Sequence, residues 1–248
     1  MLKVRIAPVL TFNGLSLVKT KNFSQPRTVG NPIQSARIYN SRNVDELIFI
    51  DINATSQKRK LNTNLVKKII DECFMPVTIG GGINTFNDIN DLLRIGADKV
   101  IIKTKAIMDS NFVTSAVQYF GSQCISIAVD AYKHNNQYYI NNIHGIKLTL
   151  NEFISKMIEC KVGEFVVNSV DNDGMMNGFD KELLYKMNKL TRLPIIALGG
   201  AGSPQHFQEL YNFGFKGAMA ASSIYHFTQF TPLEVKRHLL ENKVPIRI

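Results

Sequence analysis

Residues 79–104, IGGGINTFNDINDLLRIGADKVIIKT, have a counterpart at residues 198–222, LGGAGSPQHFQELYNFGFKGAMAAS. A single offset of 118 residues pairs positions along the whole chain: Gly81 with Gly199, Gly96 with Gly214, Thr104 with Ser222, Glu46 with Glu164, and Arg5 with Gln123. Similarity at one fixed offset is typical of an internal duplication. We therefore predict one domain over residues 1–248, built from two halves at about 1–120 and 121–248.

Short runs rich in β-branched residues alternate with patterns whose apolar residues recur every three or four positions. The predicted strands lie within residues 3–10, 46–52, 76–80, 99–104, 124–131, 164–170, 194–200 and 217–222. Eight strands, each followed by a helix, predict the α/β class and a single (β/α)8 TIM barrel with duplicated halves.

The composition restricts the classes of partner. The 29 Lys and Arg exceed the 20 Asp and Glu, but the basic residues are scattered, and the densest run, 56–62, is typical of a solvated loop. We expect no nucleic acid and no membrane partner. Cys73, Cys124 and Cys160 lie far apart, and no apolar run reaches eighteen residues, so we expect a soluble cytoplasmic protein. The five histidines show no metal-ligand spacing, and we expect no metal and no cofactor.

Glycines and hydroxyls follow matching strands in the two halves. Loops at the carboxyl ends of barrel strands build the active site, and backbone N–H groups there bind phosphate. Two equivalent sites predict a ligand with a phosphate at each end, although turns also require glycine. The candidate substrate- and phosphate-binding residues are Lys19, Asp51, Gly81, Gly82, Lys103, Thr104, Asp173, Gly174, Gly199, Gly200, Ala221 and Ser222.

Three aspartates stand at or just beyond predicted strand ends. Asp130 ends an apolar strand, and we predict that it is catalytic, whereas Asp51 and Asp173 are expected to position or cap neighbouring groups. Lys19 lies in a long predicted loop, residues 13–30, and is either a lid over a phosphate or an ordinary exposed lysine.

The chain resembles the HisF family, the cyclase subunits of imidazole glycerol phosphate synthase. The resemblance runs from residue 1 to 247 and is carried by several motifs: VGNP (29–32), DELIFIDI (45–52), TIGGGI (78–83), FGSQ (120–123), VDNDG (170–174) and IIALGGAG (195–202). It implies a lyase that uses ammonia to convert a bis-phosphorylated ribulosyl formimino-aminoimidazole carboxamide into imidazole glycerol phosphate and the aminoimidazole carboxamide ribotide.

The resemblance also implies a heterodimer with a HisH-like glutaminase subunit at the strands' amino-terminal face. The interface residues of the family fall on Asp98 and Gln123. Ammonia from the glutaminase then passes a gate of four charged residues at the barrel floor, which fall on Arg5, Glu46, Lys99 and Glu164.

The mouth departs from the family pattern at four positions. The family's second catalytic aspartate is Thr11 here, and a threonine cannot shuttle a proton near neutral pH. The family's asparagine, threonine and serine elsewhere in the mouth are Lys103, Asn168 and Leu198.

Three hypotheses follow. We favour a paralogous ammonia-channelling subunit that serves an altered acceptor, in a nitrogen-sugar or surface-polysaccharide pathway, because the floor is retained and the mouth is changed. The alternatives are an authentic imidazole glycerol phosphate synthase cyclase and a non-catalytic activator of a glutaminase.

Overall fold

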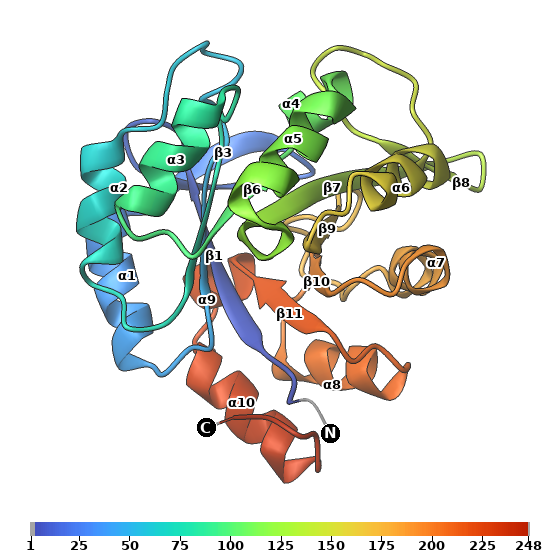
Figure 1. Ribbon diagram of the computed structural model, residues 1–248. Helices are drawn as coiled ribbons and strands as arrows, with labels where there is room; N and C mark the ends of the chain where they lie inside the picture. Colours follow the sequence, from blue (N-terminus) through green and yellow to red (C-terminus); the bar gives the residue numbers. More distant parts are fainter. Residues whose placement is uncertain (1–2, 248) are drawn as a thin grey trace.

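The computed structural model describes residues 3–247, and it confirms the predicted (β/α)8 barrel (Figure 1). Parallel pairing runs from β1 through β4, β5, β6, β7, β9 and β10 to β11, and β11 returns to β1 with Ile6 opposite Met219. Within the described residues the barrel strands are β1 (Ile6–Phe12), β4 (Leu47–Asp51), β5 (Val77–Gly80), β6 (Lys99–Ile102), β7 (Ile125–His134), β9 (Glu164–Ser169), β10 (Ile195–Leu198) and β11 (Ala218–Ala221).

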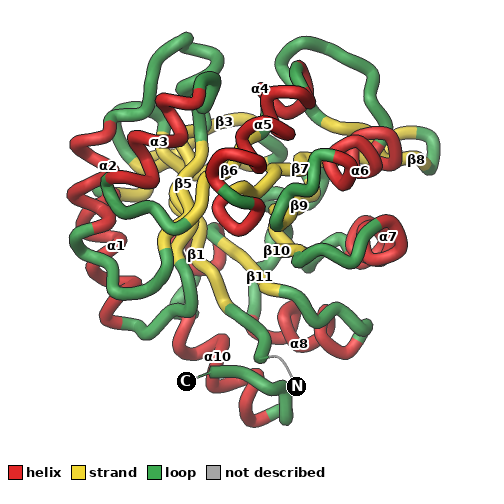
Figure 2. Tube along the Cα trace, viewed as in Figure 1, coloured by secondary structure: helices red, strands yellow, loops and turns green. Residues whose placement is uncertain are grey.

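Helices surround the barrel on its outside (Figure 2). The long ones are α1 (Pro32–Ser41), α2 (Thr63–Ile70), α3 (Phe86–Arg94), α5 (Ser110–Phe120), α6 (Leu150–Glu159), α7 (Lys181–Leu190), α8 (Pro204–Asn212) and α10 (Pro232–Glu241). Shorter ones are α4 (Thr104–Met108), α9 (Ser223–Phe227) and a 3₁₀ turn at Ser122–Cys124. Thr85, Thr149 and Thr231 begin their helices with capping boxes, which fix where α3, α6 and α10 start. Over residues 3–247, no helix combines the length and apolar character needed to cross a bilayer.

Two β-hairpins extend from the mouth, and the sequence interpretation was wrong about both. Residues 13–30, predicted to be a loop, contain β2 (Leu17–Lys21) and β3 (Ser24–Gly30). The strand predicted to end near Asp130 continues to His134 and pairs with β8 (Gln137–Ile140). Asn22 and Phe23 both have positive φ, 47° and 62°, as in the tight turns that match strand twist.

Apolar residues fill two separate cores. The larger core lies between the barrel and its helices. The smaller one fills the barrel interior with side chains from alternate strand positions: Ala7, Val9, Ile48, Ile101, Val166, Ile196, Ala218 and Ala220. The barrel interior between its two ends is therefore apolar.

Residues that are 118 positions apart occupy corresponding places in the barrel. Gly81 follows β5 and Gly199 follows β10, with φ of 107° and 94°. At Gly81 a Cβ atom would lie 2.2 Å from the carbonyl oxygen of Asp51, so only glycine permits this approach. Thr104 begins α4, and Ser222 immediately precedes α9. The boundary of the two halves near residue 120 stays a prediction from the sequence.

Candidate functional site

A cavity of about 470 Å³ opens at the carboxyl ends of the barrel strands. It brings together most of the residues that the sequence predicts for the mouth: Thr11, Lys19, Asp51, Gly81, Gly82, Lys103, Thr104, Asp130, Asn168, Asp173, Leu198 and Ser222. Four predicted site residues, Gly174, Gly199, Gly200 and Ala221, are not among its lining residues. The base of the cavity is apolar and includes Val9, Ala128 and Val166.

Asp51 holds the loop that follows β4. Arg59 binds both oxygens of its carboxylate, Nη1 to Oδ2 at 2.5 Å and Nη2 to Oδ1 at 2.7 Å. The backbone N–H groups of Asn53 and Ala54 donate to Oδ1. A bidentate arginine pair of this kind is rigid as well as strong. Arg59 belongs to the basic run that the sequence interpretation assigned to solvent, and no local pattern indicates its partner.

Asp173 fixes the β2–β3 hairpin to the loop after β9. Its Oδ1 accepts from Lys19 Nζ at 2.8 Å, and both side chains are buried. Thr20 Oγ1 donates to Oδ2, and the Asn22 N–H donates to the Asp173 carbonyl oxygen at 2.8 Å. Lys19 is therefore not an ordinary exposed lysine. Gly174 lets the two segments meet, since a Cβ there would lie 2.2 Å from the Thr20 carbonyl oxygen.

His226 in α9 has a pKa lowered to about 4, first because it is partly buried and second because Lys19 carries a positive charge nearby. Since this pKa lies below that of an unfolded histidine, the unfolded chain binds more protons as the pH falls toward 4. We expect His226 to remove about 2 kcal/mol of stability between pH 7 and pH 4.5. Urea unfolding of His226→Gln should show a correspondingly flatter pH dependence than wild type over that range. Parallel curves for the two proteins would contradict the prediction.

Asp130 forms an ion pair in the centre of the mouth. Lys103 Nζ lies 2.5 Å from Asp130 Oδ2, and it also lies 5.7 Å from the centre of the Phe23 ring on the hairpin. Asp130 on β7 stands opposite Asn168 on β9. The residue predicted to be catalytic and the lysine that departs from the family pattern thus form one unit.

Some hydroxyl and amide groups of the mouth form hydrogen bonds within the protein, and others have no partner there. The Thr11 hydroxyl donates to the carbonyl oxygen of Val18, so its proton is committed to the hairpin backbone. Within the described part of the chain, Asn168 Oδ1 and Ser222 Oγ are buried without a hydrogen-bond partner. Buried polar atoms normally find partners, so these two are suited to a ligand.

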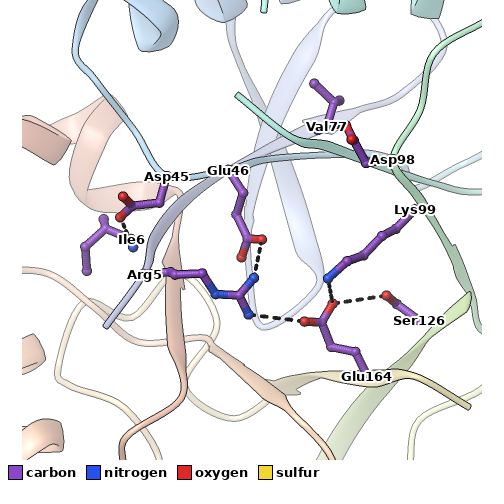
Figure 3. A network of polar contacts seen from close by, with 9 residues as sticks. All are labelled: Arg5, Ile6, Asp45, Glu46, Val77, Asp98, Lys99, Ser126 and Glu164. Carbon is purple, nitrogen blue, oxygen red and sulfur yellow. Dashed lines mark hydrogen bonds and ion pairs between the residues drawn. The ribbon is translucent and has the colours of Figure 1, made fainter. Parts of the chain in front are cut away.

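A network of charges closes the opposite end of the barrel, where the strands begin (Figure 3). Arg5 joins two carboxylates, Nη1 to Glu46 Oε2 at 2.9 Å and Nη2 to Glu164 Oε2 at 3.2 Å. Glu164 Oε1 also accepts from Lys99 Nζ at 2.8 Å and from the Ser126 hydroxyl. Burial raises the pKa of the Glu46 carboxyl, and the charge of Arg5 opposes this. The four residues predicted for the gate are therefore in one connected set.

The residues predicted for a partner interface also lie at this end. Asp98 precedes β6, and its Oδ2 accepts from the Val77 N–H at 2.8 Å. Gln123 lies in the 3₁₀ turn before β7, and both residues are exposed. A neighbouring aspartate, Asp45, accepts from the Ile6 N–H and forms an ion pair with Lys236. This ion pair was not predicted from the sequence.

Comparison with known proteins gives one consistent result. Residues 5–231 match the model of a family described as histidine biosynthesis protein. Three relatives bear the name imidazole glycerol phosphate synthase subunit HisF. They are 38% identical (Flavobacterium johnsoniae), 37% (Thermococcus onnurineus) and 36% (Endomicrobium trichonymphae), in alignments that cover 100% of this chain and 100%, 99% and 96% of the relative.

Proposed function

Because the chain belongs to the HisF family of imidazole glycerol phosphate synthase subunits, we propose that it is the synthase subunit of a glutamine-dependent complex and uses ammonia at the mouth of its barrel. A HisH-like glutaminase docks at the floor, on the face that carries Asp98 and Gln123. Ammonia passes the charged ring and the apolar barrel interior to reach Asp130. The observation that carries the proposal is the succession of charged ring, apolar barrel interior and mouth cavity from one end of the barrel to the other.

The first candidate reaction is the one that the relatives' names state, the synthesis of imidazole glycerol phosphate. These names support the authentic cyclase better than the altered acceptor that the sequence analysis favours. In this proposal the substrate's phosphates bind near Gly82 and Thr104 in one half and near Gly200 and Ser222 in the other. Asp130 takes a proton during the attack of ammonia on the substrate between them.

A second candidate, an ammonia-using subunit with an altered acceptor, is favoured by two observations in the mouth. Thr11 replaces the family's second catalytic aspartate and donates to Val18. Lys103 replaces an asparagine and pairs with Asp130. Both changes lie in the mouth, at or beside the predicted catalytic positions, and the ring of Arg5, Glu46, Lys99 and Glu164 at the floor is retained.

The experiment that tests the proposal is turnover of the bis-phosphorylated ribulosyl substrate by the purified protein with ammonium salts at mildly alkaline pH. Chromatography follows both products. Formation of imidazole glycerol phosphate would support the first candidate and exclude a merely activating role. Tight binding of the substrate without product would favour the altered acceptor. The absence of both binding and product would contradict the proposed phosphate sites.

The floor ring gives a separate prediction. Lys99→Ala removes one of the two cations that hold Glu164, and we expect glutamine-dependent turnover in the complex to change by about tenfold, the effect of about 1.4 kcal/mol on a barrier. Turnover with free ammonium should stay near the wild-type value, because ammonium reaches the mouth from solvent. Lys156→Ala, an exposed change on α6, is the control. An equal response with both nitrogen sources would contradict the passage of ammonia through the ring.

A further inference from the structure

We propose that Lys103 is a catalytic residue, the general acid of the mouth, and that it works as one proton-transfer unit with Asp130. In this unit the Lys103 ammonium gives a proton to the oxygen of a carbonyl-class acceptor, and the Asp130 carboxylate takes a proton from the attacking nitrogen. The inference rests on the proposed ammonia-dependent function. It supplies the second proton-transfer group that Thr11 cannot provide.

The other charged groups that line the cavity are committed to the protein itself. The Asp51 carboxylate is fully buried under Arg59 and two backbone N–H groups. Asp173 and Lys19 are 5% and 6% exposed and bind each other. By contrast, the Lys103 and Asp130 side chains are 26% and 15% exposed. Among the charged side chains that line the described cavity, these two are the ones that stay partly exposed to a ligand.

The pair is arranged so that each partner keeps capacity for a ligand. Asp130 Oδ2 contacts Lys103 Nζ, and within the described residues no hydrogen bond occupies Oδ1, which can accept from a nitrogen nucleophile. The Lys103 ammonium has three donors, and its contact with Asp130 is an ion pair, so donors remain for a ligand. The centre of the Phe23 ring on the hairpin lies 5.7 Å from Nζ, within the range of a cation–π contact.

The protons balance over one addition step. Ammonia attacks the acceptor carbon, the new C–N bond forms, and the C=O π bond breaks toward oxygen. That oxygen takes a proton from Lys103, which becomes a neutral amine, while the positively charged nitrogen gives a proton to Asp130. The protonated Asp130 then returns a proton to Lys103 across the 2.5 Å contact, and both groups regain their starting charges.

The rival explanation is that Lys103 only anchors Asp130, and substitution by arginine separates the two roles. Arginine keeps the positive charge and can bind the carboxylate, but it does not give up a proton in proteins. We expect Lys103→Arg to lower kcat with ammonium by about 10²-fold, the usual contribution of a general acid, and to leave KM for ammonium within about twofold. Lys103→Gln, whose amide N–H can donate to Asp130, should lose a similar factor. Lys60→Arg, an exposed change in the β4–α2 loop, is the matched control and should behave as wild type.

The outcomes distinguish this inference from the function on which it rests. The inference is supported if the wild-type protein forms product and both Lys103 variants lose most of their kcat. Calorimetry must then show that the variants bind the bis-phosphorylated substrate as the wild-type protein does. If the wild-type protein forms product and the kcat of Lys103→Arg is within about threefold of the wild-type value, the inference alone is overturned and Lys103 is an anchor for Asp130. Absence of product from the wild-type protein overturns the proposed cyclase chemistry and this inference with it.

Discussion

Asp130→Asn is expected to lower kcat for ammonia-dependent product formation by about 10²- to 10⁴-fold, the range typical of a lost general base. The amide has the shape of the carboxylate and keeps an oxygen for Lys103, but it cannot take a proton from a nitrogen. We expect no replacement from Thr11, the family's second catalytic position, because its hydroxyl is committed to Val18. The effect should therefore fall on kcat, while binding of the bis-phosphorylated substrate remains close to wild type.

Steady-state turnover with ammonium and calorimetric binding of the substrate measure the two effects separately. Asp91→Asn, on the exposed face of α3, is a matched control that removes the same charge far from the cavity. Unchanged turnover in Asp130→Asn would remove Asp130 from the mechanism. Loss of binding with the loss of turnover would instead indicate that Asp130 holds the ligand.

The second large effect concerns stability. Lys236 on α10 is fully buried, and its Nζ donates to the Asn43 carbonyl oxygen at 2.7 Å and to Asp45 Oδ1 at 2.9 Å. Lys236→Ala leaves the buried Asp45 carboxylate without its cation, and removal of one partner from such a pair costs about 3–5 kcal/mol. We expect the free energy of unfolding to fall by that amount at pH 7, measured in urea.

Two further variants identify the cause of this loss. Lys236→Met combined with Asp45→Asn removes both charges and keeps most of the volume, so it should recover much of the stability, as replacement of buried pairs often does. Arg237→Ala, the exposed neighbour on the same helix, should change the free energy of unfolding by less than about 0.5 kcal/mol. A loss below about 1 kcal/mol in Lys236→Ala would show that the pair is not needed to hold α10.

Local chemistry explains what the sequence predicts well. Gly81 and Gly199 are recognisable because a backbone with positive φ favours glycine, and the same glycine recurs 118 residues later in the chain. The floor charges are recognisable because Arg5, Glu46 and Glu164 stand in otherwise apolar strand segments. Position along a parallel strand then determines the end of the barrel at which each side chain lies.

Tertiary partners explain what the sequence does not predict. Lys236 and Arg59 occur in charged surroundings typical of solvent-exposed faces, and only the fold brings them to Asp45 and Asp51. The β2–β3 hairpin was missed because its turn, Asn22-Phe23, lacks the glycine that usually marks such a turn. Lys103 and Asp130 lie at the carboxyl ends of the neighbouring strands β6 and β7, which the predicted barrel also places side by side, but the sequence does not show that the two side chains meet.

The two ends of the described chain complete the barrel together. β1 pairs with β11, the Val4 N–H donates to the Pro245 carbonyl oxygen, and Val4 forms a bridge with Ile246. The first and last described segments therefore lie side by side (Figure 1). During synthesis the first strand leaves the ribosome long before its neighbour exists. One edge of β1 must therefore stay unpaired until β11, residues 218–221, has emerged. Closure of the barrel thus waits for contacts between residues that are far apart in the chain.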